Sequence, residues 1–383
     1  MATVTGIAAG REVASTVLRP KIREASFEDY EGVVALQLRN GLATRSYSEW
    51  LALWKGNPAY EQLGRQSPIG WILESPQGEV GGFIGNLSLA YQWKGRQLHA
   101  SSAYSWTVDQ QHRGYSMALL DCFLRQNNVD LFVCTTVNST AETVFRALRF
   151  SRVPSGTWDT SGFWVTKYRD FAKSALKAAS IPSSPLLVAP LSAALYLRDT
   201  LSFNRSGLSA DCELETCAGF DERFDAFWEQ LQREQSNSLL AVRTRETLEW
   251  HYRRSLSKGE AWIFAISRGD RLVAYAVFDR QDHPALDLKR VRLVDFQALA
   301  GYEQTIRQVL ACMLHKCRAA GIHIAENVGC SLDRLKVRAA EAPYRRKMKS
   351  WVFYYRAREA DLSAVLQDPE VWAPSSFDGD ASL

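Results

Sequence analysis

The chain has 383 residues, which is more than one hydrophobic core usually serves, so the length predicts two domains. Its composition, with 46% hydrophobic and 23% charged residues, is that of an ordinary soluble globular protein. The net charge is only +4, because 46 basic residues face 42 acidic ones, and this balance excludes a long-range field that would select nucleic acid as a partner.

The first half of the chain alternates between strand and helix patterns. The stretch over 1–18 is small and polar without an apolar run, so we expect a flexible N-terminus and no signal peptide. A short strand over 21–25 and a helix that Ser26 can cap come next. The alternation predicts an α/β or α+β layered fold. The further expected elements are a hairpin over 71–84, strands over 85–92 and 104–108, a helix over 117–126, a strand over 131–135, a helix over 140–148 and a terminal strand over 162–166.

The second half repeats this order. Ala-, Ser- and Pro-rich helical pieces over 169–205 are interpreted as a helical linker. Its apolar run over 185–197 contains a proline and is too short to span a bilayer, although contact with a membrane surface stays open. The similar series over 206–358 indicates a repeat of the unit over 19–168. The acidic, Ser-rich end over 359–383 is predicted to be largely disordered.

One stretch carries a chemical signal, namely Val108-Asp109-Gln110-Gln111-His112-Arg113-Gly114-Tyr115-Ser116-Met117-Ala118. It follows a strand and opens a helix, so it offers unpaired backbone N–H groups to an anion. The small residues Gly114, Ser116 and Ala118 let a phosphate approach the backbone, and Arg113 adds positive charge. A plain tight turn explains the same residues equally well, so the loop alone leaves both interpretations open.

The loop resembles the acyl-CoA loop of the GNAT superfamily of N-acetyltransferases, which runs Arg/Gln-x-x-Gly-x-Gly/Ala after a strand ending in Val. Arg113, Ser116 and Ala118 stand at its three marked positions, with Ser116 in place of the usual Gly. The family's later pattern Asn-x-x-Ala-x-x-x-Tyr-x-x-x-Gly-Phe is matched in spacing by Asn138, Ala141, Phe145, Arg149 and Phe150. With the opening over 22–29, the resemblance covers about residues 20–167. It implies two GNAT-like domains, each a mixed, mostly antiparallel sheet flanked by helices, the second one degenerate.

The resemblance implies direct transfer of an acyl group from acetyl-CoA or another acyl-CoA, with no metal. In this family the pyrophosphate sits on the loop amides, the pantetheine arm pairs beside the strand, and a backbone amide polarises the thioester carbonyl. The residues that this places against the cofactor are Thr107, Val108, Arg113, Gly114, Tyr115, Ser116, Met117, Ala118, Asn138 and Phe145. Two positions depart from the family: Phe145 replaces the Tyr that protonates the leaving thiolate, and Arg149 replaces a Gly at a turn.

The sequence does not identify the general base that would take a proton from the acceptor. His99 has a suitable ordinary pKa, but a structural histidine explains it too. Asp109 follows the strand directly and suits a cap of the loop equally well. Tyr104 lies on the same face of the expected strand as Trp106 and Val108, because side chains alternate along a strand. This favours a core position for Tyr104. These three residues are the candidate catalytic residues.

The second unit is expected to have lost its CoA site. After the strand over 291–296 no arginine precedes small residues at the right spacing, and Glu303 would repel a phosphate. We expect this unit to close the acceptor cleft or to present substrate. Trp250, Tyr252 and Arg253 are candidate lining residues, although Trp250 also suits the packing of a helix.

The sequence thus predicts an acyl-CoA-dependent N-acyltransferase, with acetyl-CoA as the expected donor and an amine of a small molecule or sugar as the acceptor. The alternative is a non-catalytic binding or scaffold protein on the same fold, favoured by Phe145 and by the missing base. The seven cysteines form no CxxC pair and no Cys/His cluster, so we expect reduced thiols, no metal site and a cytoplasmic location. A homodimer stays open.

Overall fold

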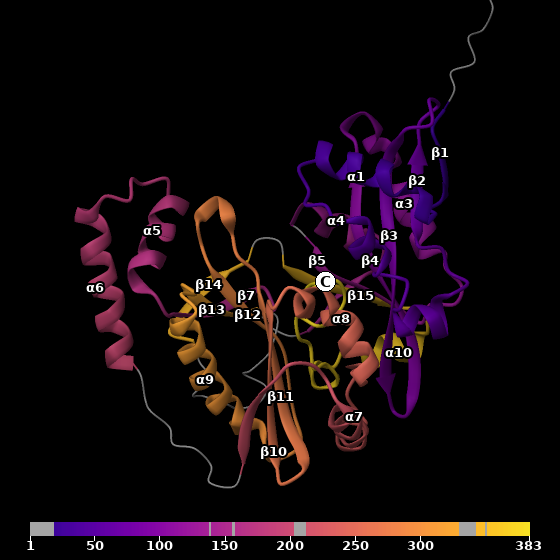
Figure 1. The fold of residues 1–383 in the computed structure, drawn as a ribbon. Coiled ribbons are helices and arrows are strands. Elements are labelled where there is room, and N and C mark those ends of the chain that lie inside the picture. The colour runs from indigo at the N-terminus through magenta and orange to yellow at the C-terminus, as the bar shows by residue number, and fades with distance from the viewer. Residues whose placement is uncertain (1–18, 138, 155–157, 203–211, 329–341, 349–350) are drawn as a thin grey trace, which may run out of the picture.

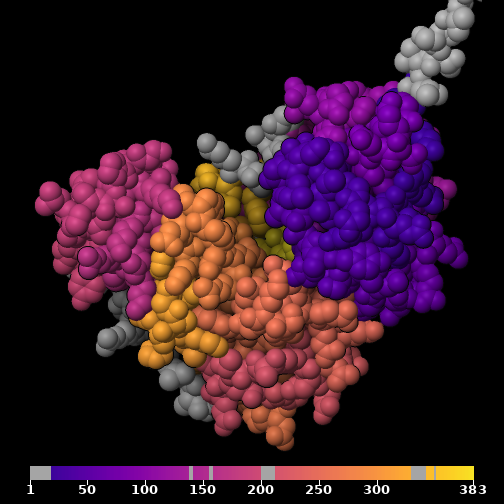
Figure 2. Space-filling view, turned by 45° about the horizontal axis from the view of Figure 1, so that its top comes forward, coloured from indigo at the N-terminus to yellow at the C-terminus, as the bar shows by residue number. Residues whose placement is uncertain are grey.

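The computed structural model describes residues 19–137, 139–154, 158–202, 212–328, 342–348 and 351–383. They form two β-sheets that lie side by side, each flanked by helices (Figure 1). The first and second halves of the chain meet along a broad face in the space-filling view (Figure 2). The predicted mixed α/β class is therefore confirmed.

The first sheet has the strand order β1-β2-β3-β4-β5-β15-β6, with the short β9 paired to β3. All neighbours are antiparallel except β4 and β5, which run parallel. Its strands are β1 (Lys21–Glu24), β2 (Gly70–Glu74), β3 (Val80–Trp93), β4 (Arg96–Val108), β5 (Leu131–Val137), β6 (Ser151–Arg152), β9 (Leu240–Ala241) and β15 (Val352–Ala357). The predicted hairpin is β2 and β3, and Gly78 turns it with a left-handed φ of 83°.

The second sheet has the order β14-β7-β13-β12-β11-β10-β8, and here β12 and β13 form the parallel pair. Its strands are β7 (Thr160–Val165), β8 (Glu213–Cys217), β10 (Ala261–Arg268), β11 (Arg271–Arg280), β12 (Arg290–Ala298), β13 (Ile324–Val328) and β14 (Tyr344–Lys347). Read from the opposite edge, this order matches the first sheet strand for strand. The fold is therefore an internal duplication.

The two halves exchange one strand each. β7 comes from the first half of the chain but lies between β13 and β14 in the second sheet. β15 comes from the end of the chain but lies between β5 and β6 in the first sheet. The strand expected over 162–166 therefore exists, but it closes the other half's sheet. Because each sheet needs a strand from the other half, the two halves are interlocked, and the boundaries after 168 and 205 remain predictions.

Helices pack against both sheets. They are α1 (Tyr30–Arg39), α2 (Tyr47–Leu51), α3 (Ser116–Leu124), α4 (Ser139–Ala147), α5 (Tyr168–Ala178), α6 (Pro185–Ser202), α7 (Glu222–Glu234), α8 (Arg245–Ser257), α9 (Ile306–Ala319) and α10 (Ala360–Val365). α7 and α8 join the core cluster that the two sheets share. α5 and α6 pack on each other and stand to one side of the molecule, where the linker was expected (Figure 1). Of the described helices, none combines the length and apolar content needed to cross a bilayer.

The end of the chain is ordered and buried, so the expectation of a largely disordered segment over 359–383 does not hold for it. Trp372 and Phe377 are 2% and 5% exposed and join a core cluster that contains residues of both sheets. Asp378 in this segment is buried and accepts from the Tyr91 hydroxyl at 2.8 Å. Burial of a few aromatic side chains and hydrogen bonding of the acids thus keep this segment ordered, although its composition is acidic and Ser-rich.

Candidate active site

The two parallel strands of the first sheet separate shortly after they meet. β4 and β5 pair only over 100–102 on one strand and 131–133 on the other. β4 continues to Val108 and β5 to Val137, with no further pairing between them. We call this opening the fork. The β4 edge that faces it keeps backbone groups available for an extended ligand.

β4 carries a bulge beside the fork. Its pairing with β3 slips here, so that Ser105 and Trp106 together oppose a single residue. Ser105 has a φ of 52°, which a serine keeps only where its surroundings hold it. Gln37 Nε2 donates to Ser105 Oγ at 2.8 Å, and Thr107 Oγ1 donates to the Ser105 carbonyl at 3.1 Å. The bulge therefore re-aims the backbone of β4 at the fork.

The expected phosphate loop stands at the end of β4. It forms the 3-10 helix η3 (Gln110–Tyr115), and α3 follows at once without a side-chain cap on its first amides. Arg113 and Gly114 are exposed, and a Cβ on Gly114 would meet nothing within 4 Å. An anion can therefore reach this helix start directly. Of the other residues assigned to the cofactor, Thr107 is buried, Val108, Tyr115 and Ser116 are partly buried, and Met117 and Ala118 are exposed.

Asp109 ties this loop to α1. Its carboxylate accepts from Arg39 Nη2 at 2.8 Å and from Asn40 Nδ2 at 2.9 Å. Burial disfavours its charge, but the bonds from Arg39 and Asn40 outweigh burial and hold the pKa of Asp109 below the usual carboxyl value. Both oxygens are engaged, so the geometry favours the structural role over that of a base.

His99 and Tyr104 lie on either side of the paired part of β4. The Tyr104 hydroxyl stands at the fork and accepts from Arg45 Nε at 2.9 Å. His99 is buried with Nδ1 2.6 Å from the Asn128 carbonyl, and burial lowers its pKa. About 16 Å of strand separates the two residues, so only Tyr104 can contact a ligand in the fork.

Phe145, which the resemblance aligns with a proton-donating tyrosine, is buried in an aromatic cluster. Its ring is 3% exposed and packs on Trp106, Phe150 and Tyr354 at centroid distances of 6.3, 5.0 and 5.7 Å. Arg149 stands where the resemblance expects a glycine. It adopts a left-handed φ of 61°, a conformation that is strained for a residue with a side chain. Asn138, also assigned to the cofactor, lies outside the described residues.

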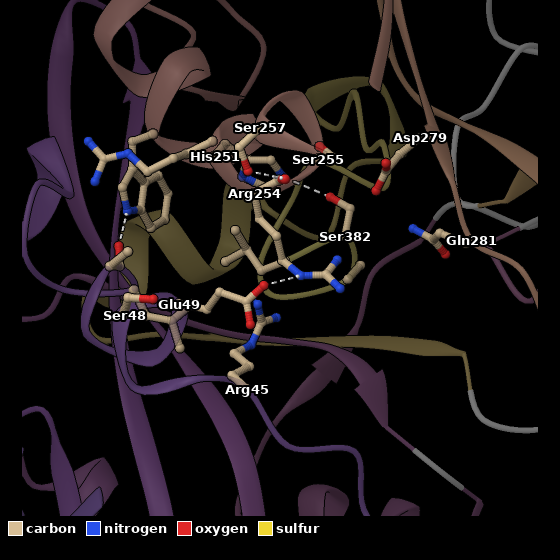
Figure 3. A pocket seen from close by; sticks show the side chains of 16 residues that line it. Arg45, Ser48, Glu49, His251, Arg254, Ser255, Ser257, Asp279, Gln281 and Ser382 are labelled. Carbon is tan, nitrogen blue, oxygen red and sulfur yellow. Dashed lines mark hydrogen bonds and ion pairs between the residues drawn. The ribbon is translucent and has the colours of Figure 1, made fainter. Parts of the chain in front are cut away.

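A cavity of about 560 Å³ opens between the two halves (Figure 3). Its walls are α2 with the residues before it, α8, the end of β11 and residues 381–383. The charged residues and the tryptophan in these walls are Arg45, Glu49, Trp250, Arg253, Arg254 and Asp279. Trp250 and Arg253 were expected to line a cleft and do so, whereas Tyr252 is buried in the shared core and is not a wall residue.

The cavity adjoins the fork through Arg45. This residue lines the cavity, donates to Tyr104 at the fork and holds its guanidinium 5.9 Å from the Tyr104 ring. Glu49 is already neutralised, because Lys258 and Arg254 contact its carboxylate at 2.7 and 3.1 Å. No ion pair joins Arg253 to a described residue, so this cation is available to an anionic ligand, whereas Arg45 is also attracted by the Asp380 carboxylate.

Asp279 supplies a buried acid at the far wall of this cavity. It is 6% exposed, and its Oδ1 has no hydrogen-bond partner among the described residues. Burial, with a smaller contribution from Glu260, raises the pKa of Asp279 to about 6. An acid held in this way costs stability, and its place in the cavity wall makes Asp279 a candidate functional residue. Neither Arg45 nor Asp279 was singled out from the sequence, because no local motif surrounds them.

We expect Asp279→Asn to stabilise the protein at pH 7.5 by about 3 kcal/mol, because the amide carries no charge that burial would penalise. The folded-state pKa of Asp279 is raised, so its penalty is present above that pKa and vanishes as the pH falls toward the ordinary carboxyl value. Urea unfolding at pH 7.5 and pH 4 measures this. A gain of equal size at both pH values would contradict the assignment of a buried charge.

The second sheet has a corresponding opening after the paired part of β12 and β13, but the chain's own groups fill it. The Ser375 hydroxyl donates to Asp295 of β12, and the Ser376 hydroxyl donates to the Val328 carbonyl at the end of β13. In the loop after β12, Glu234 accepts from the amide of Ala300, and Glu303 accepts from the amide of the next residue. The amides that would bind a phosphate are thus occupied by carboxylates, in keeping with a degenerate second unit.

Solved structures share this fold. A GCN5-related N-acetyltransferase from Anabaena variabilis aligns with a TM-score of 0.53 at 13% identity, over 88% of this chain and 73% of its own. One from Kribbella flavida gives 0.54 at 10%, over 90% and 72%. The N-myristoyltransferase of Saccharomyces cerevisiae with bound myristoyl-CoA gives 0.53 at 12%, over 91% and 82%. No protein-family model and no curated protein sequence matches the chain. The protein therefore has a GNAT fold in two domains, and its structural neighbours are acyltransferases.

Proposed function

We propose that this protein is an acyl-CoA-dependent N-acyltransferase in which an amine attacks the thioester directly. The observation that carries the proposal is the fork, with the bulge at Ser105 on its edge and the uncapped start of α3 at its end. An extended pantetheine arm suits an unpaired strand edge, and a diphosphate suits a helix start. The fold shared with two N-acetyltransferases and an N-myristoyltransferase supports this assignment.

Each part of the acyl-CoA is assigned to residues of β4 or of the loop that follows it. Its pyrophosphate binds the amides over 113–118, with Arg113 as a counter-charge, and its pantetheine arm lies along β4 near Thr107 and Val108. A β4 amide at the bulge polarises the thioester carbonyl. Phe145 cannot protonate the leaving CoA, so the thiolate takes its proton from solvent. Acetyl-CoA is the expected donor, and the bound myristoyl-CoA of the yeast enzyme makes longer acyl-CoAs worth testing.

The acceptor is proposed to be an amine on a small molecule or sugar that also carries an anionic group. It binds in the cavity between the halves, which adjoins the fork through Arg45. Arg253 is exposed and makes no ion pair with a described residue, so a carboxylate or phosphate of the acceptor would supply its partner. Glucosamine 6-phosphate should therefore be a better acceptor than glucosamine, which differs only in lacking the anion. Action in the cytoplasm remains a prediction.

A non-catalytic acyl-CoA-binding protein is the second candidate. It is favoured by Phe145, whose ring occupies the place of a proton donor and is fully packed. The two candidates share the cofactor site and differ in turnover, so release of CoA in the presence of an amine separates them.

The experiment that tests the proposal is thermal unfolding with and without acetyl-, octanoyl- and myristoyl-CoA. A ligand that binds only the folded state adds about 2.7 kcal/mol of stability at a hundredfold excess over its dissociation constant. A raised midpoint with one of the three supports a working cofactor site. No shift with any of them contradicts both candidates.

We expect Arg113→Ala to weaken acyl-CoA binding by about 1 to 3 kcal/mol, the scale of one charged hydrogen bond. Arg125→Ala is the matched control, because Arg125 is an exposed arginine at the other end of α3 and pairs with Asp121 one turn away. Isothermal titration of both variants measures the difference. Equal affinities in the two variants would contradict the placement of the pyrophosphate.

A further inference from the structure

The last residues of the chain run through the middle of the molecule, between the two sheets (Figure 1). The segment 375–383 first fills the opening of the second sheet and then reaches the fork of the first. It continues into the wall of the cavity, where His251 Nε2 lies 2.7 Å from the Ser382 hydroxyl (Figure 3). The sequence pattern indicated nothing of this course.

Asp380 is the residue that this segment places at the fork. Thr135 Oγ1 donates to Asp380 Oδ1 at 2.8 Å. Thr135 is fully buried on β5, two positions beyond Val133, the last β5 residue that pairs with β4. Gly379 makes this approach possible, since a Cβ there would lie 2.5 Å from the Thr135 methyl group and its φ of 63° is left-handed. The carboxyl thus stands where the strands separate.

The charged and titratable groups that face this carboxyl are few. Arg45 of the cavity wall attracts it, the Cys134 thiol lies beside it on β5, and the Asp378 carboxyl precedes it in the same segment. Burial raises the pKa of Asp380 above the usual carboxyl value, although the hydroxyls of Thr135 and Ser102 and the charge of Arg45 act to lower it. A carboxylate with a raised pKa accepts protons better than an ordinary surface aspartate.

We propose that Asp380 is the proton acceptor of the transfer reaction, an inference that rests on the proposed function. It deepens that function by supplying the base that no local motif revealed. The other candidate groups are weaker: Asp109 has both oxygens engaged, His99 lies away from the fork, and the Tyr104 hydroxyl is held by Arg45. Asp279 lines the far wall of the cavity, away from the fork.

In the proposed acyl transfer, every bond formed and every proton moved is accounted for. The amine nitrogen attacks the thioester carbonyl carbon with its lone pair, the C–N bond forms, and the carbonyl electrons move to oxygen. The nitrogen then bears positive charge, and its proton passes to the Asp380 carboxylate directly or through one water. Collapse of the intermediate breaks the C–S bond, and the thiolate takes a proton from solvent. Asp380 returns its proton to solvent, leaving an amide and CoA.

A purely structural Asp380 would only hold the terminal segment in place through Thr135, and asparagine would do the same. The two roles are separated by turnover and by its pH profile. The assay is release of the CoA thiol from the acyl-CoA that gives the largest thermal shift, with glucosamine 6-phosphate, glycine or water as acceptor. Asp380→Asn is compared with Asp361→Asn, a control that changes an exposed acid in the first turn of α10.

We expect Asp380→Asn to lower the rate of CoA release by about a hundredfold or more, with acyl-CoA affinity unchanged within about twofold. Asp380→Glu should restore part of the rate, and Asp361→Asn should keep all of it. The wild-type rate should fall as the pH drops through a value above that of an ordinary carboxyl, and Asp380→Asn should lack this step. If Asp380→Asn does not fold, Thr135→Val carries the test, because it frees the carboxyl and should lower the rate about tenfold.

Three results are decisive against the inference or its basis. A rate in Asp380→Asn above a tenth of the wild-type value overturns the role of Asp380. Acyl-CoA binding to the wild-type protein without release of CoA to any of the three acceptors overturns it as well and favours the non-catalytic candidate. Absence of acyl-CoA binding removes the proposed function itself.

Discussion

Replacing Arg243 by methionine is expected to destabilise the protein by about 3 to 5 kcal/mol, the cost of leaving one charge of a buried pair without its partner. Arg243 Nε and Nη2 donate to Asp295 at 2.8 and 3.1 Å, with the two side chains 1% and 0% exposed. The same arginine donates to the Ala241 carbonyl and to Ser375. The change therefore also loosens the segment that carries Asp380.

Urea unfolding measures this effect, and the exposed pair between Arg125 and Asp121 provides the matched control. Its side chains are 78% and 53% exposed, so Arg125→Met should cost less than about 1 kcal/mol. The double variant Arg243→Met with Asp295→Leu should recover part of the loss, because no unpaired charge remains. Equal effects of Arg243→Met and Arg125→Met would show that the buried pair contributes nothing special.

Acidification from pH 7.5 to pH 4 is expected to cost the wild-type protein about 3 kcal/mol through His251 alone. Burial lowers the pKa of His251 to about 3, with Asp295 opposing and Arg243 adding to this effect. In the unfolded chain its pKa is near the ordinary value of about 6.5. Between these two values the unfolded state binds the proton and the folded state does not, so stability falls as the pH falls.

His251→Gln removes the titration and keeps a hydrogen-bonding group toward Ser382. The loss of stability between pH 7.5 and pH 4 should be about 3 kcal/mol smaller in His251→Gln than in the wild type. Asp279 acts in the opposite direction over part of this range, so the comparison between variants is the informative quantity. An identical acid loss in both proteins would contradict a buried neutral His251.

The local sequence pattern was sufficient to predict most of the strands and helices and one loop. The hairpin of β2 and β3 followed from alternation around a Ser-Pro-Gln-Gly turn, and the loop over 108–118 followed from small residues and an arginine at a helix start. These features depend on neighbours in the chain, which a sequence displays directly. The GNAT resemblance drew on the same stretch, and the fold comparison confirms it.

The local sequence pattern could not predict which strands pair with each other. β15 reads as an alternating strand wherever it docks, and only its pairing with β5 and β6 places it in the first sheet. The acidic end of the chain reads as solvated for the same reason. Its burial depends on partners far away in sequence, such as Tyr91 for Asp378 and Thr135 for Asp380.

The sequence by itself thus determined the fold class, the duplicated order of elements and the loop at the start of α3, because each arises from interactions between residues close together in the chain. The tertiary structure decided the strand exchange, the cavity with Arg45 and Asp279, and the arrival of Asp380 at the fork. These depend on contacts across 245 residues in the case of Thr135 and Asp380. Their free energy comes from burial and pairing in the assembled core, for which a linear pattern of residues carries no local signal.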